Sequence, residues 1–595
     1  MSTTGTPPGV HFRVEAADLH AHLFGVTLTI DAPAAVQQLA LPVWIPGSYL
    51  VREFSKNLQQ LQAHQGKRQL ALRQLDKHRW EVAAQPGQPL VLRYQVYALD
   101  NSVRTAWLDA ERGFFNGTSL FLSVQGQEHC AHSVEIVSSA AIAHWSVATG
   151  ALAQRVDKRG FGNYVAANYD ELVDCPVEMG AFWSGTFQAG GVAHRFVVAG
   201  AAPSFDGARL LADTQKICQT QIRFWHGNKK PPQRDYVFML NAVDDSYGGL
   251  EHRNSTTLIC KRADLPQQSV APTATNAKPN EGYTRLLGLI SHEYFHTWNV
   301  KRLRPLELAQ YDYTRENYTE LLWFFEGFTS YYDDLLLRRC QRIDDATYLT
   351  LLAKTINQVE QTPGRKLQSV AQASFDAWVK YYRQDENTPN ATVSYYTKGA
   401  LVALCLDLTL RHEGHTTLDA VMVALWQRCQ GGPMAQDDLA QVLQQLGHRS
   451  YTGELARWVH GTAELPTLAL LQRHGIEVHH EPGPVAERLG LRVKEGSSLK
   501  ISHVLRGGAA EQAGFSSGDE WLGLHVGRGT DAQAWRMRTL DDLALYAGKA
   551  KKVVALVARD QRLLNLPLTL PAPTHALRLT LKNAERARPW LTGQS

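Results

Sequence analysis

The spacing of hydrophobic residues changes twice along this chain, and these changes limit the folds that it can adopt. From about residue 10 to 183, short runs alternate apolar and polar residues between turn signals such as Pro46-Gly47, which is typical of antiparallel strands. The next segment, to about residue 465, opens with strand-like runs and continues with helical spacing, which predicts an α+β domain. After Pro466 strand-like runs return between glycine-rich turns. The predicted fold class is therefore multidomain α+β.

Composition and charge exclude several classes of protein. The 595 residues are 44% hydrophobic and 20% charged, as expected for three or four folded domains. The net charge of +4 is spread along the chain, so nucleic acid is not an expected partner. Seven dispersed cysteines without a C-x-x-C pair indicate neither a disulfide framework nor a thiolate zinc site. No signal peptide or membrane-spanning run is recognised, so we expect a cytoplasmic protein with no membrane partner.

The pentad His292-Glu293-Tyr294-Phe295-His296 lies in a stretch with helical spacing. Residues four apart on a helix differ by about 40° in azimuth, so both imidazoles project from one face. They can then share a tetrahedral Zn²⁺, with the glutamate beside the open coordination position. The pentad predicts one zinc ion per chain.

Two histidines and a water leave one protein ligand missing, and a carboxylate on a later helix commonly supplies it. Glu326 is the candidate, because its aromatic neighbours make a buried carboxylate costly unless it is protonated, paired or bound to a metal. The alternative is a helix carboxylate paired with Lys or Arg. Ser330 and Asp333 share its helical face, and either could hydrogen-bond a zinc-bound histidine. We favour Asp333.

Several separated motifs together resemble one family. They are VWIPGSYLVREFSKN, YGGLEHRNS, HEYFHTWNVKRLRP, WFFEGFTSYY and SYYTKGA, and they are similar to motifs of the glycyl aminopeptidase family of zinc metallopeptidases, a gluzincin branch related to aminopeptidase N. The resemblance implies an N-terminal antiparallel β domain (1–183), a thermolysin-like α+β zinc peptidase domain (184–465), a PDZ-like β-rich domain (470–572) and a C-terminal tail (573–595).

The resemblance also implies roles for single residues. The zinc ligands are His292, His296 and Glu326, and Glu293 is the general base for the attacking water. Tyr396 matches the tyrosine that stabilises the oxyanion in related aminopeptidases. The adjacent tyrosine of the Tyr-Tyr pair, at position 395, stays open as an alternative.

Gly248, Gly249 and Glu251 belong to a stretch that resembles the exopeptidase motif G-x-M-E-N, with Leu and His in place of Met and Asn. The resemblance implies that Glu251 binds the free α-ammonium of the substrate, which allows one residue before the cut. The following run, residues 253–261, is predicted to be the edge strand that pairs with an extended peptide.

The C-terminal region contains Leu489-Gly490-Leu491, which matches the carboxylate-binding loop of a bacterial-type PDZ domain, and a turn-helix-turn at 507–519. A peptide C-terminus is therefore a candidate partner of this region. A purely structural module is the alternative.

These features predict a zinc-dependent aminopeptidase that acts on peptides with a free N-terminus. The preference for small residues such as Gly or Ala is implied by the family resemblance alone. The alternatives are a PDZ-assisted zinc endopeptidase or oligopeptidase and a catalytically inactive PDZ scaffold. A polar loop at 262–282 is expected to be mobile within the middle domain.

Overall fold

The computed structural model describes residues 9–268, 280–527 and 533–593. Most of the loop predicted at 262–282 lies outside these residues. The chain forms two compact units, one of Met1–Tyr318 with Leu425–Ala435 and one of Thr319–Ala424 with Gln436–Ser595. None of the described helices combines the length and the apolar composition needed to cross a membrane.

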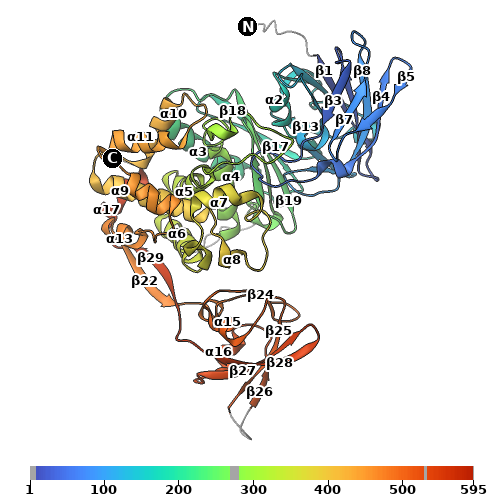
Figure 1. The fold of residues 1–595 in the computed structure, drawn as a ribbon. Coiled ribbons are helices and arrows are strands. Elements are labelled where there is room, and N and C mark those ends of the chain that lie inside the picture. Colours follow the sequence, from blue (N-terminus) through green and yellow to red (C-terminus); the bar gives the residue numbers. More distant parts are fainter. Residues whose placement is uncertain (1–8, 269–279, 528–532, 594–595) are drawn as a thin grey trace. The chain divides into compact units, whose positions relative to one another are not determined.

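The N-terminal region is built from β-sheets, coloured blue in Figure 1. An eight-stranded sheet contains, in order, β14 (Leu152–Val156), β15 (Gly162–Ala166), β12 (His132–Ile136), β1 (Val10–Asp18), β2 (Leu23–Ile30), β8 (Leu90–Tyr97), β4 (Leu58–Gln65) and β5 (Arg68–Leu70). One four-stranded sheet contains β13 (Ser146–Thr149), β16 (Val177–Gly180), β10 (Arg112–Phe115) and β9 (Ala106–Leu108). Another contains β11 (Ser123–Val124), β3 (Val36–Ala40), β7 (Arg79–Ala83) and β6 (Leu72–Gln74).

The alternation of apolar and polar residues in the sequence matches the alternation of buried and exposed side chains on these strands. On β1, Val10, Phe12 and Val14 are buried while Arg13 and Glu15 are exposed. The buried side chains join one hydrophobic core with those of β2 and β8. Two short helices, α1 (Gly117–Leu120) and α2 (Tyr169–Val173), accompany the sheets.

A five-stranded sheet follows, in the order β17 (Trp183–Ala189), β18 (Val192–Ala199), β19 (Asp235–Val243), β21 (Ser255–Lys261) and β20 (Gly248–Glu251). Helices α3 (Gly207–His226) and α4 (Glu281–Phe295) pack against each other beside it. The prediction that residues 253–261 form the open edge is wrong. β21 pairs with β19 on one side and with β20 on the other, because the hairpin places β20 outermost.

The helical part of the chain contains α5 (Leu322–Arg339), α6 (Asp345–Glu360), α7 (Val370–Phe375), α8 (Thr388–Ala391), α9 (Thr397–Glu413), α10 (Leu418–Arg428), α11 (Gln436–Gly447), α12 (Thr452–Leu455) and α13 (Thr467–Arg473). Side-chain caps mark several helix starts. The carboxylates of Asp206 and Asp344 and the amide oxygen of Asn280 each accept a hydrogen bond from the backbone amide three residues later.

The C-terminal β-rich region has a hydrophobic core of its own. Its six-stranded sheet contains β23 (Leu491–Lys494), β24 (Lys500–Val504), β25 (Glu520–Val526), β27 (Lys552–Arg559) and β28 (Arg562–Thr569), with β26 (Gln533–Arg536) paired to β25. Three short helices belong to it, α14 (Val485–Leu489), α15 (Ala509–Ala513) and α16 (Asp542–Ala547).

The described part of the C-terminal tail predicted at 573–595, which ends at residue 593, contains regular structure. β29 (His575–Leu581) pairs with β22 (Ile476–Pro482), and α17 (Ala584–Thr592) buries Trp590. The indole of Trp590 donates a hydrogen bond to the hydroxyl of Tyr331 on α5 at 2.9 Å. Burial of this tryptophan anchors α17 against α5.

Candidate active site

The last turn of α4 presents the two histidines of the pentad. His292 lies in that turn, and His296 follows directly after the last helical residue. Their ring centroids are 4.7 Å apart and the rings are nearly perpendicular, at 86°. The predicted projection of both imidazoles from one face of the helix is therefore observed.

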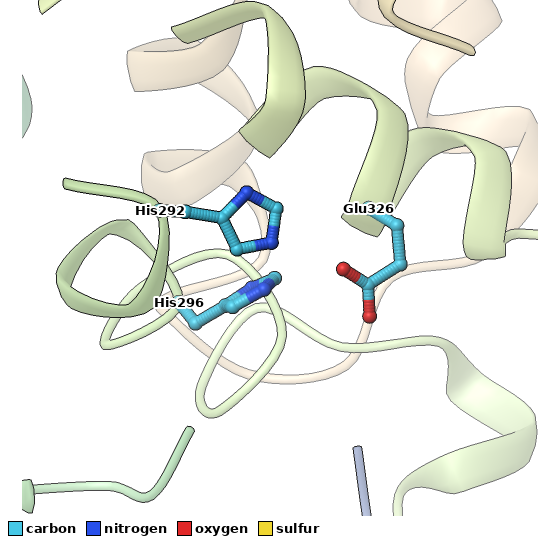
Figure 2. A group of neighbouring side chains, drawn as sticks. All are labelled: His292, His296 and Glu326. Carbon is cyan, nitrogen blue, oxygen red and sulfur yellow. The ribbon is translucent and has the colours of Figure 1, made fainter. Parts of the chain in front are cut away.

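Glu326 on α5 completes a group with these histidines. One donor atom from each of His292, His296 and Glu326 lies within 4.8 Å of the other two, and Figure 2 shows the three side chains pointing toward one another. Glu326 is 2% exposed, so its charge requires a partner. Two imidazoles and one carboxylate are a donor set that zinc prefers.

A backbone carbonyl orients one of these histidines. Nδ1 of His296 lies 2.8 Å from the carbonyl oxygen of Asn299, and because a carbonyl can only accept, Nδ1 carries the proton. The lone pair of Nε2 is then available to a metal ion. The carbonyl of Asn299 therefore fixes the tautomer of His296.

Two glycines position Glu326 through a close crossing of α5 and α9. A Cβ added to Gly327 would lie 2.6 Å from the Cα of Gly399, and one added to Gly399 would lie 2.9 Å from the Cα of Gly327. Such distances are too short for any side chain. The close crossing of the two helices explains why glycine occupies positions 327 and 399.

Tyrosines surround the carboxylate of Glu326. Tyr396 precedes the first residue of α9, and burial, reinforced by the charge of Glu326, raises its pKa well above the usual value. Tyr381 has a pKa of about 12, raised mainly by burial and also by Glu326. Tyr395 is fully buried and stacks on Tyr396 with centroids 4.8 Å apart. Of the adjacent pair, Tyr396 is the less buried side chain.

The two remaining predicted carboxylates meet beside His296. One donor atom each from Glu251, Glu293 and His296 lies within 4.8 Å of the other two. Glu251 ends β20, and Glu293 lies on α4. The hairpin thus brings the predicted ammonium anchor next to the predicted general base.

Glycines make room for both carboxylates. A Cβ on Gly249 would lie 2.1 Å from Oε1 of Glu293, and a Cβ on Gly47 would lie 2.5 Å from Oε1 of Glu251. Gly47 also has a φ of +90°, which L side chains rarely adopt. Gly47 comes from the N-terminal region, so that region forms part of the wall of the site.

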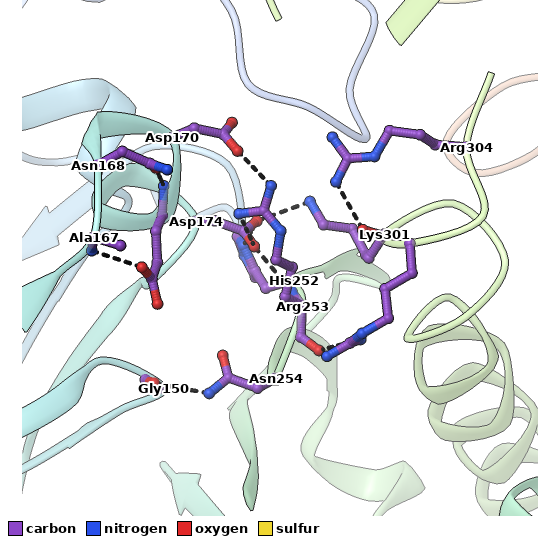
Figure 3. A network of polar contacts seen from close by, with 12 residues as sticks. Gly150, Ala167, Asn168, Asp170, Asp174, His252, Arg253, Asn254, Lys301 and Arg304 are labelled. Atoms are coloured by element: carbon purple, nitrogen blue, oxygen red, sulfur yellow. Dashed lines mark hydrogen bonds and ion pairs between the residues drawn. The ribbon is translucent and has the colours of Figure 1, made fainter. Parts of the chain in front are cut away.

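A buried ionic network supports the turn after Glu251 (Figure 3). Asp174, at the end of α2, accepts from Lys301 at 2.8 Å and lies 3.1 Å from Nδ1 of His252. The other carboxylate oxygen of Asp174 accepts from the backbone amide of Arg253 at 3.0 Å. Burial alone would raise the pKa of Asp174. The interactions with Lys301, His252 and Arg253 outweigh this effect and hold the pKa of Asp174 well below its usual value.

The segment that carries Lys301 is strained. Val300 has a φ of +133°, an unfavourable conformation for a β-branched residue. Backbone hydrogen bonds hold the segment, from Lys301 to His296 at 3.1 Å and from Leu303 to Trp298 at 2.9 Å. This strain lies four residues after the predicted zinc ligand His296, and strain is often found at functional sites.

The other predicted residues lie elsewhere or stay untested. Asp333 accepts a hydrogen bond from the backbone amide of Asp334, and its contact with a histidine ligand stays a prediction. Leu489 ends α14, Gly490 adopts the left-handed conformation with φ +72°, and Leu491 begins β23. These three residues form a turn at the edge of the C-terminal sheet.

Sequence reasoning missed several residues of the site. In the sequence, Gly47 is recognised only as part of a Pro-Gly turn, and no neighbouring residue indicates that it contacts Glu251. Asp174 and Lys301 are ordinary charged residues until the fold buries them together. Tyr381 could have been suspected from the cluster of tyrosines near Tyr396, but the sequence does not show that it lies near Glu326.

The chain matches two family models. Residues 11–181 match the Peptidase M61 N-terminal domain, and residues 285–402 match the M61 glycyl aminopeptidase domain. A search of curated proteins gave no significant match.

Solved structures were compared as well. A crystal structure described as an aminopeptidase N family protein from Idiomarina loihiensis is 36% identical, with a TM-score of 0.91, and the match covers 98% of this chain and 100% of that one. An M1 zinc metallopeptidase from Deinococcus radiodurans is 16% identical, with a TM-score of 0.47, over 78% of this chain and 96% of that one, and a likeness of this degree has no bearing on activity. The chain belongs to the M61 peptidase family, and it is an aminopeptidase-like metallopeptidase with a zinc cofactor.

Proposed function

We propose that this protein removes the N-terminal residue from peptides with a free α-amine, preferring a small residue such as Gly or Ala. One observation carries the exopeptidase assignment. Donor atoms of Glu251 and Glu293 lie within 4.8 Å of each other and of His296. When the substrate ammonium binds to Glu251, one residue fits between it and the scissile peptide bond, beside which Glu293 acts as the general base. The small-residue preference rests on the family alone.

His292, His296 and Glu326 are proposed to hold the zinc ion. When bound, zinc supplies Lewis-acid chemistry that polarises the scissile carbonyl and acidifies water. Glu293 accepts the proton of the attacking water and returns it to the departing amine. Its position against Gly249 keeps the carboxylate beside the substrate-binding strand.

Tyr396 is proposed to donate its hydroxyl proton in a hydrogen bond to the oxyanion of the transition state. Its raised pKa keeps the hydroxyl protonated at neutral pH, so the donor is always present. The neighbouring charge of Glu326 contributes to this effect. A phenylalanine at position 396 would remove the donor and retain the ring.

The test compares glycyl, alanyl and leucyl amides, each with a free or an acetylated amine, on the wild type and Glu251→Gln. We expect hydrolysis of the free amines only, fastest for glycyl and alanyl. Glu251→Gln should raise KM strongly, because an ion pair with the ammonium is lost. Equal cleavage of acetylated substrates would refute the aminopeptidase proposal and favour an endopeptidase.

We also propose that the C-terminal β-rich region is a PDZ-like module. The open edge strand β23 and the left-handed turn at Gly490 support this, because such a turn presents backbone amides to a peptide C-terminus. Trp535 stacks on Tyr546 of α16 with centroids 4.9 Å apart. Binding of C-terminal peptides, with and without a free carboxylate, would test the proposal.

A further inference from the structure

Arg104 lies beside the substrate-binding strand and has no acidic partner within the described part of the chain. Its Nη2 donates to the carbonyl oxygen of Gly249 at 3.5 Å, the only side-chain hydrogen bond that it makes among the described residues. Both terminal nitrogens lie 3.9 Å from the position of a Cβ on Gly248. A half-buried guanidinium without a carboxylate is unusual, because its desolvation is not offset by an ion pair.

The loop that carries Arg104 is held in one conformation. The Oγ of Ser102 accepts from the backbone amide of Arg104 at 3.2 Å and lies 3.2 Å from Oγ1 of Thr105. Asp100 accepts through its carbonyl from Ser102 at 2.9 Å. These bonds fix the backbone from which Arg104 projects, and the contact with the carbonyl of Gly249 holds the guanidinium at the strand, which reduces the entropy cost of binding.

The contact is made at the open edge of β20. The backbone amide of His252 donates to Ser255, and hydrogen-bonded and non-bonded pairs alternate along an antiparallel ladder. The backbone groups of Glu251 and Gly249 therefore face away from β21. Arg104 meets the carbonyl of Gly249 on this outer side, where an extended peptide would pair.

Three charged groups follow one another along this edge. Glu251 lies at its end and Glu293 packs against the face of Gly249, whereas Arg104 reaches the edge from the opposite face, beside Gly248. A strand advances about 3.3 Å per residue, so Glu251 and Arg104 are separated by about the length of a short peptide. The carboxylate of Glu251 lies at one end of β20, and the guanidinium of Arg104 lies near the other end.

We propose that Arg104 binds the terminal carboxylate of a dipeptide substrate and makes the enzyme prefer free dipeptides to their amides. This inference rests on the proposed function, because it requires the amine to bind at Glu251. The two termini of a dipeptide are oppositely charged, and the two ends of β20 match them. Hydrogen bonds to a charged group favour the correct ligand by about ten- to a hundred-fold.

The first experiment measures kcat/KM for glycyl-alanine and glycyl-alaninamide on the wild type, Arg104→Ala, Arg104→Lys and Arg93→Ala. Arg93 is exposed on β8 and serves as the matched control. We expect the wild type and Arg93→Ala to prefer the free acid by about ten-fold or more. Arg104→Ala should lose most of this preference, and Arg104→Lys should retain part of it.

A second measurement does not depend on turnover. Calorimetry on Glu293→Gln should show tighter binding of glycyl-alanine than of glycyl-alaninamide, and adding Arg104→Ala should remove the difference. Equal kcat/KM for acid and amide on the wild type would overturn the inference and leave the proposed function standing, even if no Arg104 variant folds. Unchanged preference in Arg104→Ala would also overturn it. Cleavage of N-acetylated glycyl-alanine as fast as glycyl-alanine would overturn the proposed function first.

Discussion

Replacing Gly249 with alanine should displace Glu293, the proposed general base, without touching the proposed metal ligands. The added Cβ would lie 2.1 Å from Oε1 and 2.4 Å from Cδ of Glu293, whereas ordinary contacts begin at 3.4 Å. Gly249 does not have a positive φ, so the backbone accepts alanine. The strain must be relieved at the Glu293 carboxylate, which is the mobile end of a side chain.

The required shift of the carboxylate is about 1 Å, and a misplacement of that size can lower a rate by about 100-fold. We expect kcat to fall by about that factor, because proton transfer depends on distance. KM for a free-amine substrate should change less, since Glu251 is two residues away. Zinc content should stay at the wild-type level.

The assay combines steady-state kinetics on glycyl and alanyl amides, metal analysis and a thermal melt. Gly453→Ala is the matched control, because a Cβ there has nothing within 4 Å. A Gly249→Ala enzyme with wild-type kcat would refute the assigned role of Glu293. Loss of zinc or a large drop in melting temperature would also refute it, since the contact would then be structural.

Three further predictions follow from the site. Glu326→Ala should lower zinc content measured by metal analysis, whereas Glu293→Gln should keep zinc and lose turnover. Asp174→Asn should destabilise the protein by about 3–5 kcal/mol in a denaturant or thermal melt, because it leaves Lys301 buried without its counter-charge. The exposed pair of Asp245 and Lys261 supplies the control, and Asp245→Asn should change stability by less than about 1 kcal/mol.

The ionisation of Asp174 also predicts a pH dependence. Its pKa in the folded protein is well below the usual 3.8, so its contribution to stability is complete above about pH 4 and is lost as the pH falls through the lower, folded value. Melting temperatures of the wild type and Asp174→Asn should therefore converge in strong acid. Curves that stay parallel down to pH 2 would contradict this ionisation.

The spacing of residues along single helices and strands predicted those features that depend on one element alone. The spacing of His292 and His296 on one helix implies a shared face, and the alternation on β1 implies its buried side. The position of Glu326 followed from the cost of burying a carboxylate among aromatic residues. The open edge of the sheet was assigned to the wrong strand, because strand order depends on how the hairpin at 252–255 folds back and not on the pattern of either strand.

Contacts between distant segments could not be predicted in this way. Gly47, Arg104 and Asp174 all come from the N-terminal region, and each approaches the hairpin of β20 and β21. The matched family ranges, 11–181 and 285–402, both omit this hairpin. That Gly47, Arg104 and Asp174 approach the same hairpin can be seen only in the folded structure.

The N-terminal region is therefore part of the candidate active site. Without it, the carboxylate of Glu251 would lose the surface formed by Gly47. Lys301 and His252, which are both about 2% exposed, would lose their counter-charge at Asp174. A chain that begins near residue 184 would retain the histidines on α4 and Glu326 on α5, but the hairpin that carries Glu251, the proposed anchor of the substrate amine, would lack its support. Such a chain could bind zinc and still fail to select peptides with a free N-terminus.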